Sequence, residues 1–228
     1  LFGCPLSLLE VKRHHQVSVL EMGMSYPGEL ATLAEIADPD IGVLTNVSGA
    51  HLAHFSSIEE VAQAKWELFA GMRENTTGIF NADDDHARRI AERFKRFVVT
   101  FGIDRPADLI ATGYRLDGLE GVSFEVEHAH NGGMRRLEVR TRFAGIHHVY
   151  NVLAAMSCGY MLGIDLEAMA VRLGELSPLW MRGRVLKLKG PVRLLDDCYN
   201  SNPAAMLSAL QVLIHAEPPL PSGRRVLV

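Results

Sequence analysis

Short apolar runs divide the first hundred residues, and each predicts a buried strand because it is rich in β-branched and aromatic side chains. They are residues 17–20, 41–44, 78–81 and 97–100. Apolar positions at helical spacing lie between them, at residues 29–36, from Ser57 onward, and after Asp84 or Asp85. Ser57 with Glu60 fits a capping box at a helix start. Strands that alternate with helices predict a doubly wound, mainly parallel sheet.

The pattern changes between residues 108 and 142. Three alternating runs, at residues 110–116, 122–126 and 137–141, are separated by glycine-rich turns. This predicts an antiparallel β meander appended to the parallel sheet. A helix over residues 151–162 follows, with Asn151 as its N-cap, and Asp165 caps another helix that runs to residue 173.

Residues 178–183 have the character of a linker, and a new strand and helix follow at residues 192–195 and 203–213. A further strand is expected from Arg225 onward. We therefore predict an α/β protein with a domain boundary at Gly183: residues 1–183 form one domain, and residues 184–228 begin a second, Rossmann-like α/β domain. The chain opens without Met and closes on an apolar run, so we expect it to be truncated at both ends.

Composition narrows the function classes. The chain is 48% hydrophobic and 22% charged, as expected for a globular protein with a core. A net charge of −4 provides no basic field for nucleic acid or an anionic membrane. No apolar run approaches the roughly 20 residues that span a bilayer. Three cysteines without close pairing predict no disulfide framework and favour a reducing cytoplasm.

Polar groups follow three of the expected strands, at Glu21, at Thr45 with Asn46, and at residues 81–83. Ligands of open parallel sheets bind outside the carboxyl ends of the strands, so these groups should face one crevice. Each taken alone could equally cap the helix that follows it.

Two residues near this crevice are ambiguous by pattern alone. His51 could be a metal ligand or a loop histidine, and Mg²⁺ ordinarily prefers oxygen ligands. Lys65 could extend its amine to solvent from an amphipathic helix. Buried against apolar neighbours, the same lysine would have a lowered pKa and a reactive amine.

Two later segments are rich in polar groups. Asn151 could cap its helix or bind the edge of a purine, because its amide both donates and accepts. Residues 196–202 contain two aspartates and two asparagines between a strand and a helix, more than structural roles require. Adjacent Asp196 and Asp197 should point to opposite faces of their strand, so only one would reach a ligand.

Several segments together, in order, resemble the Mur ligase family over essentially the whole chain. They are LEMG (20–23) with GEL (28–30), TNV (45–47) with AHL (50–52) and FSS (55–57), AQAKWE (62–67), NAD (81–83), GIHHVYNVLAA (145–155), GR (183–184) and DDCYN (196–200). Within the family, DDCYN is similar to the member that adds a dipeptide. The resemblance implies an ATP-dependent, ADP-forming amide ligase that joins D-alanyl-D-alanine to UDP-N-acetylmuramoyl-tripeptide through an acyl phosphate, in peptidoglycan precursor synthesis.

The resemblance also implies roles for individual residues. Glu21 and His51 would bind Mg²⁺, and Lys65 would be carbamylated. Asn151 would contact the adenine of ATP, and Arg184 its phosphates. The remaining nucleotide-site residues would be His147, Asn46, Asp197 and Asn200. The partners implied are these small molecules, without nucleic acid or membrane insertion, and the protein would be a monomer.

Two positions depart from the family pattern: His148 stands where Asn is usual, and Cys198 where Ser is usual. The glycine-rich phosphate loop of the family is expected before residue 1. We therefore expect the chain alone to have little or no ligase activity. Two other classes stay open, namely a non-catalytic nucleotide-binding module and a phosphohydrolase that uses residues 83–86.

Overall fold

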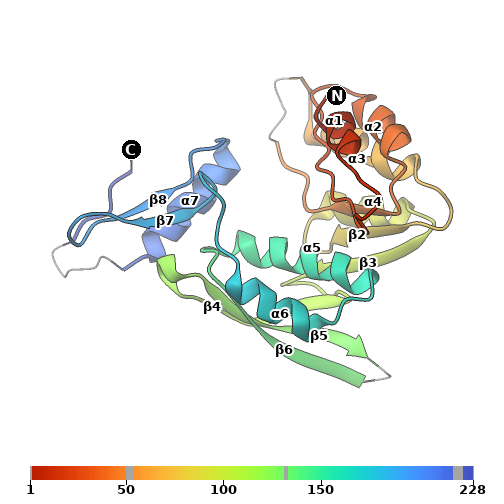
Figure 1. Cartoon of the computed structure of the whole chain (residues 1–228). Coiled ribbons are helices and arrows are strands. Elements are labelled where there is room, and N and C mark those ends of the chain that lie inside the picture. Colours follow the sequence, from red (N-terminus) through yellow and green to blue (C-terminus); the bar gives the residue numbers. More distant parts are fainter. Residues whose placement is uncertain (1, 50–53, 131–132, 218–222, 228) are drawn as a thin grey trace. The chain divides into compact units, whose positions relative to one another are not determined.

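The computed structural model describes residues 2–49, 54–130, 133–217 and 223–227 (Figure 1). The predicted metal ligand His51 lies outside the described residues. The chain forms two compact units, Leu1–Thr100 and Phe101–Val228, and each is described by itself below. The predicted domain boundary at residue 183 is a separate proposal.

Six strands form one sheet in the order β1-β2-β3-β4-β5-β6. They are β1 (Ile41–Leu44), β2 (Thr77–Asn81), β3 (Phe97–Gly102), β4 (Leu109–Leu116), β5 (Val122–His130) and β6 (Gly133–Thr141). β1 and β2 are parallel, as are β3 and β4, whereas β4, β5 and β6 are successively antiparallel. The α/β class and the appended meander are thus confirmed.

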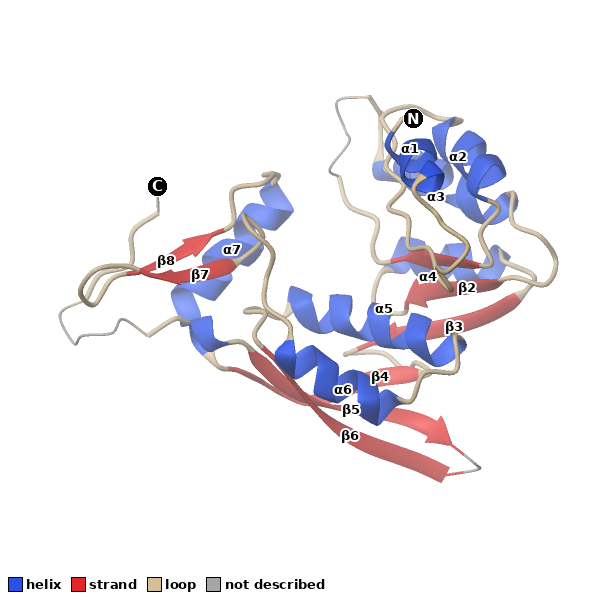
Figure 2. Cartoon of the chain, viewed as in Figure 1, coloured by secondary structure: helices blue, strands red, loops and turns tan. Residues whose placement is uncertain are grey.

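Among the described residues of the first unit, four helices accompany the strands (Figure 2). They are α1 (Gly3–Leu9), α2 (Glu29–Ala37), α3 (Ile58–Ala70) and α4 (Asp85–Arg93). The N-cap half of the predicted capping box is present, because Ser57 Oγ accepts from Glu60 N, whereas Glu60 Oε2 accepts from Ser56 N, one residue before the N-cap. Asp84 is the N-cap of α4. These short-range hydrogen bonds explain why the helix starts could be predicted locally.

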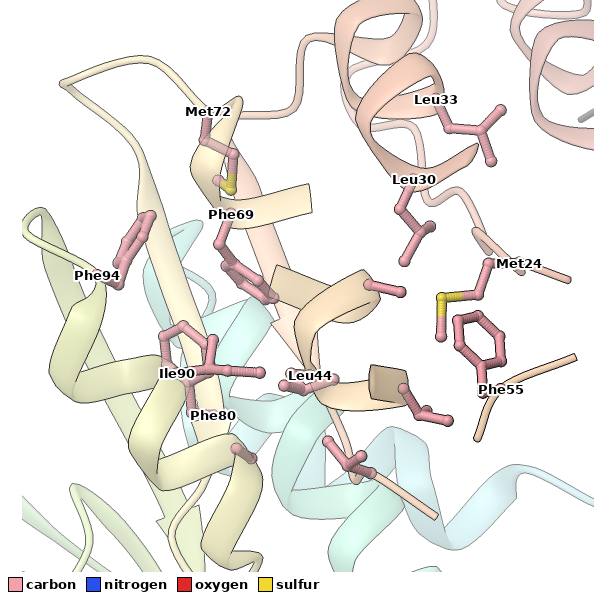
Figure 3. Packing of buried hydrophobic residues seen from close by; sticks show 14 of the residues in the cluster. Met24, Leu30, Leu33, Leu44, Phe55, Phe69, Met72, Phe80, Ile90 and Phe94 are labelled. Carbon is pink, nitrogen blue, oxygen red and sulfur yellow. The ribbon is translucent and has the colours of Figure 1, made fainter. Parts of the chain in front are cut away.

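An aromatic cluster forms the centre of the first unit (Figure 3). The rings of Phe69 and Phe80 lie 4.7 Å apart, and Phe94 meets both at 5.8 and 5.9 Å. All three side chains are buried. Such tilted and edge-on contacts add to the free energy that burial of the rings provides. The cluster joins α3, β2 and the end of α4, and so fixes the elements that carry the polar groups described below.

In the second unit, α5 (His147–Met161) and α6 (Leu166–Glu175) pack on the meander strands (Figure 2). Asp165 caps α6 as predicted, since its Oδ2 accepts from Ala168 N. A two-stranded antiparallel sheet of β7 (Arg184–Lys187) and β8 (Arg193–Asp196) follows, and then α7 (Pro203–His215). Asn202 caps α7 through a hydrogen bond from Ala205 N.

Three local predictions are wrong. Residues 17–20 form no strand, and Val19 is 92% exposed. An apolar run becomes a strand only with a hydrogen-bonding partner, and these residues join none of the strands in the described sheets. Residues 225–227 also form no strand. Asn151 is not an N-cap, because α5 already begins at His147. In the part of the chain that is described, no helix is long and apolar enough to cross a bilayer.

Candidate functional site

Hydrogen bonds connect the two loops that leave the carboxyl ends of β1 and β2. Asn81 is buried, and its Nδ2 donates to Thr45 O at 3.0 Å while its Oδ1 accepts from Asp83 N at 2.9 Å. Both ends of the amide are therefore occupied. Asn81 shapes the loops, and neighbouring Asn46 is left exposed to solvent. These polar groups therefore lie at one edge of the sheet, where the carboxyl ends of β1 and β2 meet.

Asp84 connects the same loop to α4. Its Oδ1 accepts from Ala87 N at 2.8 Å, as an N-cap, and its Oδ2 accepts from Val47 N at 2.9 Å. Asp85 forms an ion pair with Arg88 on the surface of α4. N-capping explains Asp84, and a surface ion pair explains Asp85. Neither residue therefore requires a role in a metal-dependent phosphohydrolase.

Lys65 lies on α3 with its side chain largely removed from solvent. This desolvation lowers the pKa of its amine, and the nearby negative charge of Asp84 opposes the shift. A lowered pKa increases the fraction of uncharged amine, which is the nucleophilic form. The structure therefore favours the reactive alternative for Lys65 over a lysine whose amine extends into water.

Two glutamates hold the loop between Glu21 and α2. Both carboxylate oxygens of Glu67 accept from Gly28 N at 2.9 Å. Glu29 Oε2 accepts from Ser25 N and Tyr26 N, and these backbone hydrogen bonds, that from Ser25 first, lower the pKa of Glu29. Gly28 has φ 88°, a conformation that glycine adopts without strain.

Glu21 lines a cavity of about 360 Å³ beside this loop. Glu29 and Ser25 also line it, with Cys4 and Leu33 from the flanking helices. Within the described residues, no group of three or more His, Cys, Asp or Glu side chains is arranged to hold a metal ion. Mg²⁺ is commonly bound by one or two carboxylates, with water and phosphate oxygens completing its shell. The carboxylate of Glu21 fits that requirement in its chemistry and its access to the cavity.

The second unit places two histidines at the start of α5. Burial lowers the pKa of His147, against the opposing effect of Asp197. Burial, followed by repulsion from His147, lowers the pKa of His148 to about 4. Their rings lie 4.2 Å apart, and the ring of Phe143 lies 5.2 Å from that of His148. Both imidazoles are therefore neutral at physiological pH.

Asn151 lies one turn along α5 from His148. It is exposed, and its Nδ2 lies 3.4 Å from His148 Nδ1. Because helix capping does not occupy it, the amide of Asn151 can face a ligand.

Asp196, the last residue of β8, and Asp197, which follows it, have different neighbours. Cys198 Sγ donates to Asp196 Oδ1 at 3.0 Å, whereas the charge of Asp197 acts on His147. Asn200 and Arg184 are exposed, the latter at the start of β7.

The structure thus groups the predicted residues into two sets. Asn46 and Lys65 accompany Asp84 in the first unit, while His147, Asn151 and Asp197 lie around the start of α5 in the second. Sequence reasoning did not assign the connecting roles of Glu67 and Asp84.

Comparison with known proteins gives a consistent result. The family described as "Mur ligase middle domain" matches residues 1–159. The UDP-N-acetylmuramoyl-tripeptide–D-alanyl-D-alanine ligase of Mycobacterium tuberculosis (strain ATCC 25618 / H37Rv) is 35% identical over 92% of the chain and 41% of its own length. The ligase of the same name from Escherichia coli (strain K12) is 32% identical over 99% of the chain and 48% of its own length.

Solved structures agree. The crystal structure of MurF from Acinetobacter baumannii superposes with a TM-score of 0.86 at 30% identity, covering 94% of this chain and 46% of that one. MurF ligase from Thermotoga maritima, in complex with ADP, superposes with a TM-score of 0.81 at 28% identity, covering 93% and 48%. The chain therefore spans about half the length of the relatives that it matches.

Proposed function

The chain belongs to the Mur ligase family, and we propose that it is part of an ATP-dependent, ADP-forming ligase that joins D-alanyl-D-alanine to UDP-N-acetylmuramoyl-tripeptide. Relatives with that activity in their names match nearly the whole chain. The activity would serve peptidoglycan precursor synthesis in the cytoplasm. We also propose that the protein is a monomer.

The observation that carries the proposal is the environment of Lys65. Its amine is desolvated and lies close enough to Asp84 for the two charges to interact. An uncharged amine can attack the carbon of CO₂, forming an N–C bond and releasing one proton to solvent. The resulting carbamate changes a cationic side chain into an anionic one, and this anion supplies oxygen ligands of the kind that Mg²⁺ prefers.

The first unit carries the residues that we propose for the metal. Glu21 provides a carboxylate to its cavity, and His51 is the second proposed Mg²⁺ ligand. Asn46 lies on the loop that Asn81 and Asp84 fix at the sheet edge. When bound, Mg²⁺ would neutralise charge on the phosphoryl group that is transferred.

The second unit carries the residues that we propose for adenine. Asn151 presents an exposed amide, and His147 lies beside it at the start of α5. Arg184 would contact phosphate, with Asp197 and Asn200 also contributing to the nucleotide site. We place the domain boundary between Gly183 and Arg184, so that residues 184–228 begin the second domain.

The chemistry then needs two events. The tripeptide carboxylate attacks the γ-phosphorus of ATP, giving an acyl phosphate and ADP. The dipeptide amine next attacks the acyl carbon, forming the amide bond as inorganic phosphate leaves. Positioning and fixed charge are the contributions that a protein makes to such phosphoryl transfer. This is consistent with the rigidly connected loops of the first unit.

The test is a ligase assay on the full-length protein that carries Lys65→Ala. We expect phosphate release and amide product to fall by at least about 100-fold, in the range found when a preorganised charge is removed from an active site. An added short carboxylic acid should restore part of the rate, because it can occupy the space of the carbamate.

Lys95→Ala is the matched control. Lys95 is exposed, and its Nζ donates to Glu92 O at the end of α4. The control should retain full activity. Equal activity of Lys65→Ala and Lys95→Ala would contradict the assignment of Lys65.

A further inference from the structure

His148 and Asn151 form a pair on the first turns of α5, three residues apart and therefore on the same face of the helix. The Nδ2 of Asn151 lies 3.4 Å from the Nδ1 of His148.

The ring of His148 is held from several sides. The rings of Phe143 and His147 lie 5.2 and 4.2 Å from it. Gly183 lies on the Nε2 side of the ring, because a Cβ added to this glycine would be 3.6 Å from His148 Nε2. A ring packed in this way has little freedom to rotate, so its Nδ1 stays directed at Asn151.

The neutral state of the ring determines what Nδ1 can do. With the proton on Nε2, Nδ1 has a lone pair and accepts a hydrogen bond from the Asn151 amide. One hydrogen of Nδ2 is then committed to His148, and Oδ1 is turned outward. An unpaired asparagine amide could instead rotate by 180° and present either end.

We propose that His148 is a positioning residue that fixes the orientation of the Asn151 amide and thereby selects a nucleobase with a 6-amino group. The outward Oδ1 accepts from that amino group, and the second hydrogen of Nδ2 is available to N7, which is the way asparagine recognises adenine. A 6-oxo purine presents an acceptor to Oδ1, and this repels. The inference rests on the proposed function, in which Asn151 contacts adenine.

The same geometry would allow an asparagine at position 148 to take this role. In both side chains the polar atom Nδ1 or Oδ1 is bonded directly to Cγ. An asparagine oxygen at 148 can therefore accept from Asn151 at the place where Nδ1 accepts here.

The experiment measures the binding of ATP and of inosine triphosphate to the full-length protein by calorimetry, without the peptide substrates. The unaltered protein should prefer ATP. His148→Phe keeps an aromatic ring against Phe143 but removes Nδ1, and it should reduce this preference about fivefold, as expected for one net hydrogen bond. His148→Asn should retain the preference, and Asn151→Ala should lose it.

The outcomes separate the two hypotheses. If Asn151→Ala loses the preference and His148→Phe keeps it, the positioning role is wrong and the adenine contact of Asn151 stands. If the unaltered protein has no preference, or Asn151→Ala leaves it unchanged, both the inference and the adenine role of Asn151 are wrong.

A second measurement covers the case in which His148→Phe does not fold. The side-chain amide ¹⁵N resonance of Asn151, identified by its loss in Asn151→Ala, should shift as the pH falls through about 4, where His148 gains a proton. A resonance that does not respond to this protonation would overturn the proposal.

Discussion

Replacing Asp84 by alanine should remove two hydrogen bonds at once, the N-cap of α4 and the acceptor of the Val47 amide. Loss of an N-cap costs about 1 kcal/mol. Val47 is buried, so its amide would be left without an acceptor, which costs on the order of 1–2 kcal/mol more. The free energy of unfolding should therefore fall by about 2–3 kcal/mol.

Asp165→Ala is the matched control, because Asp165 caps α6 through the amide of Ala168 at 2.9 Å and is exposed. It should cost only about 1 kcal/mol. Urea unfolding gives the two free energies, and hydrogen exchange followed by NMR reports the Val47 amide directly. Exchange at Val47 should accelerate in Asp84→Ala alone. Equal destabilisation by the two variants, with unchanged exchange at Val47, would refute the proposed connection between the loop and α4.

Three further outcomes are expected. Phe80→Ala should lower the free energy of unfolding by about 3–5 kcal/mol, as expected for a buried ring. Phe97→Ala should have little effect because Phe97 is 61% exposed. Urea titration measures both free energies. Gly145→Ala should lower the thermal midpoint, since Gly145 has φ 102° and an added Cβ would lie 2.6 Å from Val212 Cγ2; an unchanged midpoint would contradict this. Folding lowers the pKa of His148 from 6.5 to about 4, so the unfolded chain binds more protons between these values and stability falls as pH drops through this window. His148→Phe should flatten that part of the pH profile in urea titrations, and an unaltered slope would contradict the burial argument.

Elements with local signals could be predicted closely from the sequence. Ser57, Asp84 and Asp165 each accept a hydrogen bond from an amide three residues later, so the start of each helix is encoded within a few residues. The alternation and glycine turns of the meander are similarly local, and they gave the antiparallel strands β4 to β6.

Elements that depend on distant partners could not be predicted. Residues 17–20 have the composition of a strand, yet pairing requires a neighbour that the pattern does not identify. Asn151 is a favourable N-cap residue, but α5 begins at His147 with no side-chain cap. A helix start without a capping side chain has no local signal.

The candidate site shows the same division. The rule that ligands bind at the carboxyl ends of parallel strands located Asn46 and Asn81 at one edge. The bonds from Val47 to Asp84 and from Gly28 to Glu67 join residues 37 and 39 positions apart, and spacing alone does not reveal them. Pattern also left Lys65 undecided, because desolvation of its amine depends on the packed environment of α3.

The most direct test of the proposed function is product analysis with the full-length protein. ATP, UDP-N-acetylmuramoyl-tripeptide and D-alanyl-D-alanine are supplied together and singly omitted, and the products are identified by mass spectrometry. We expect an amide-linked pentapeptide product with one ADP and one phosphate for each bond formed, and no phosphate release when either peptide substrate is absent. ATP hydrolysis that proceeds without the dipeptide and yields no amide would contradict it.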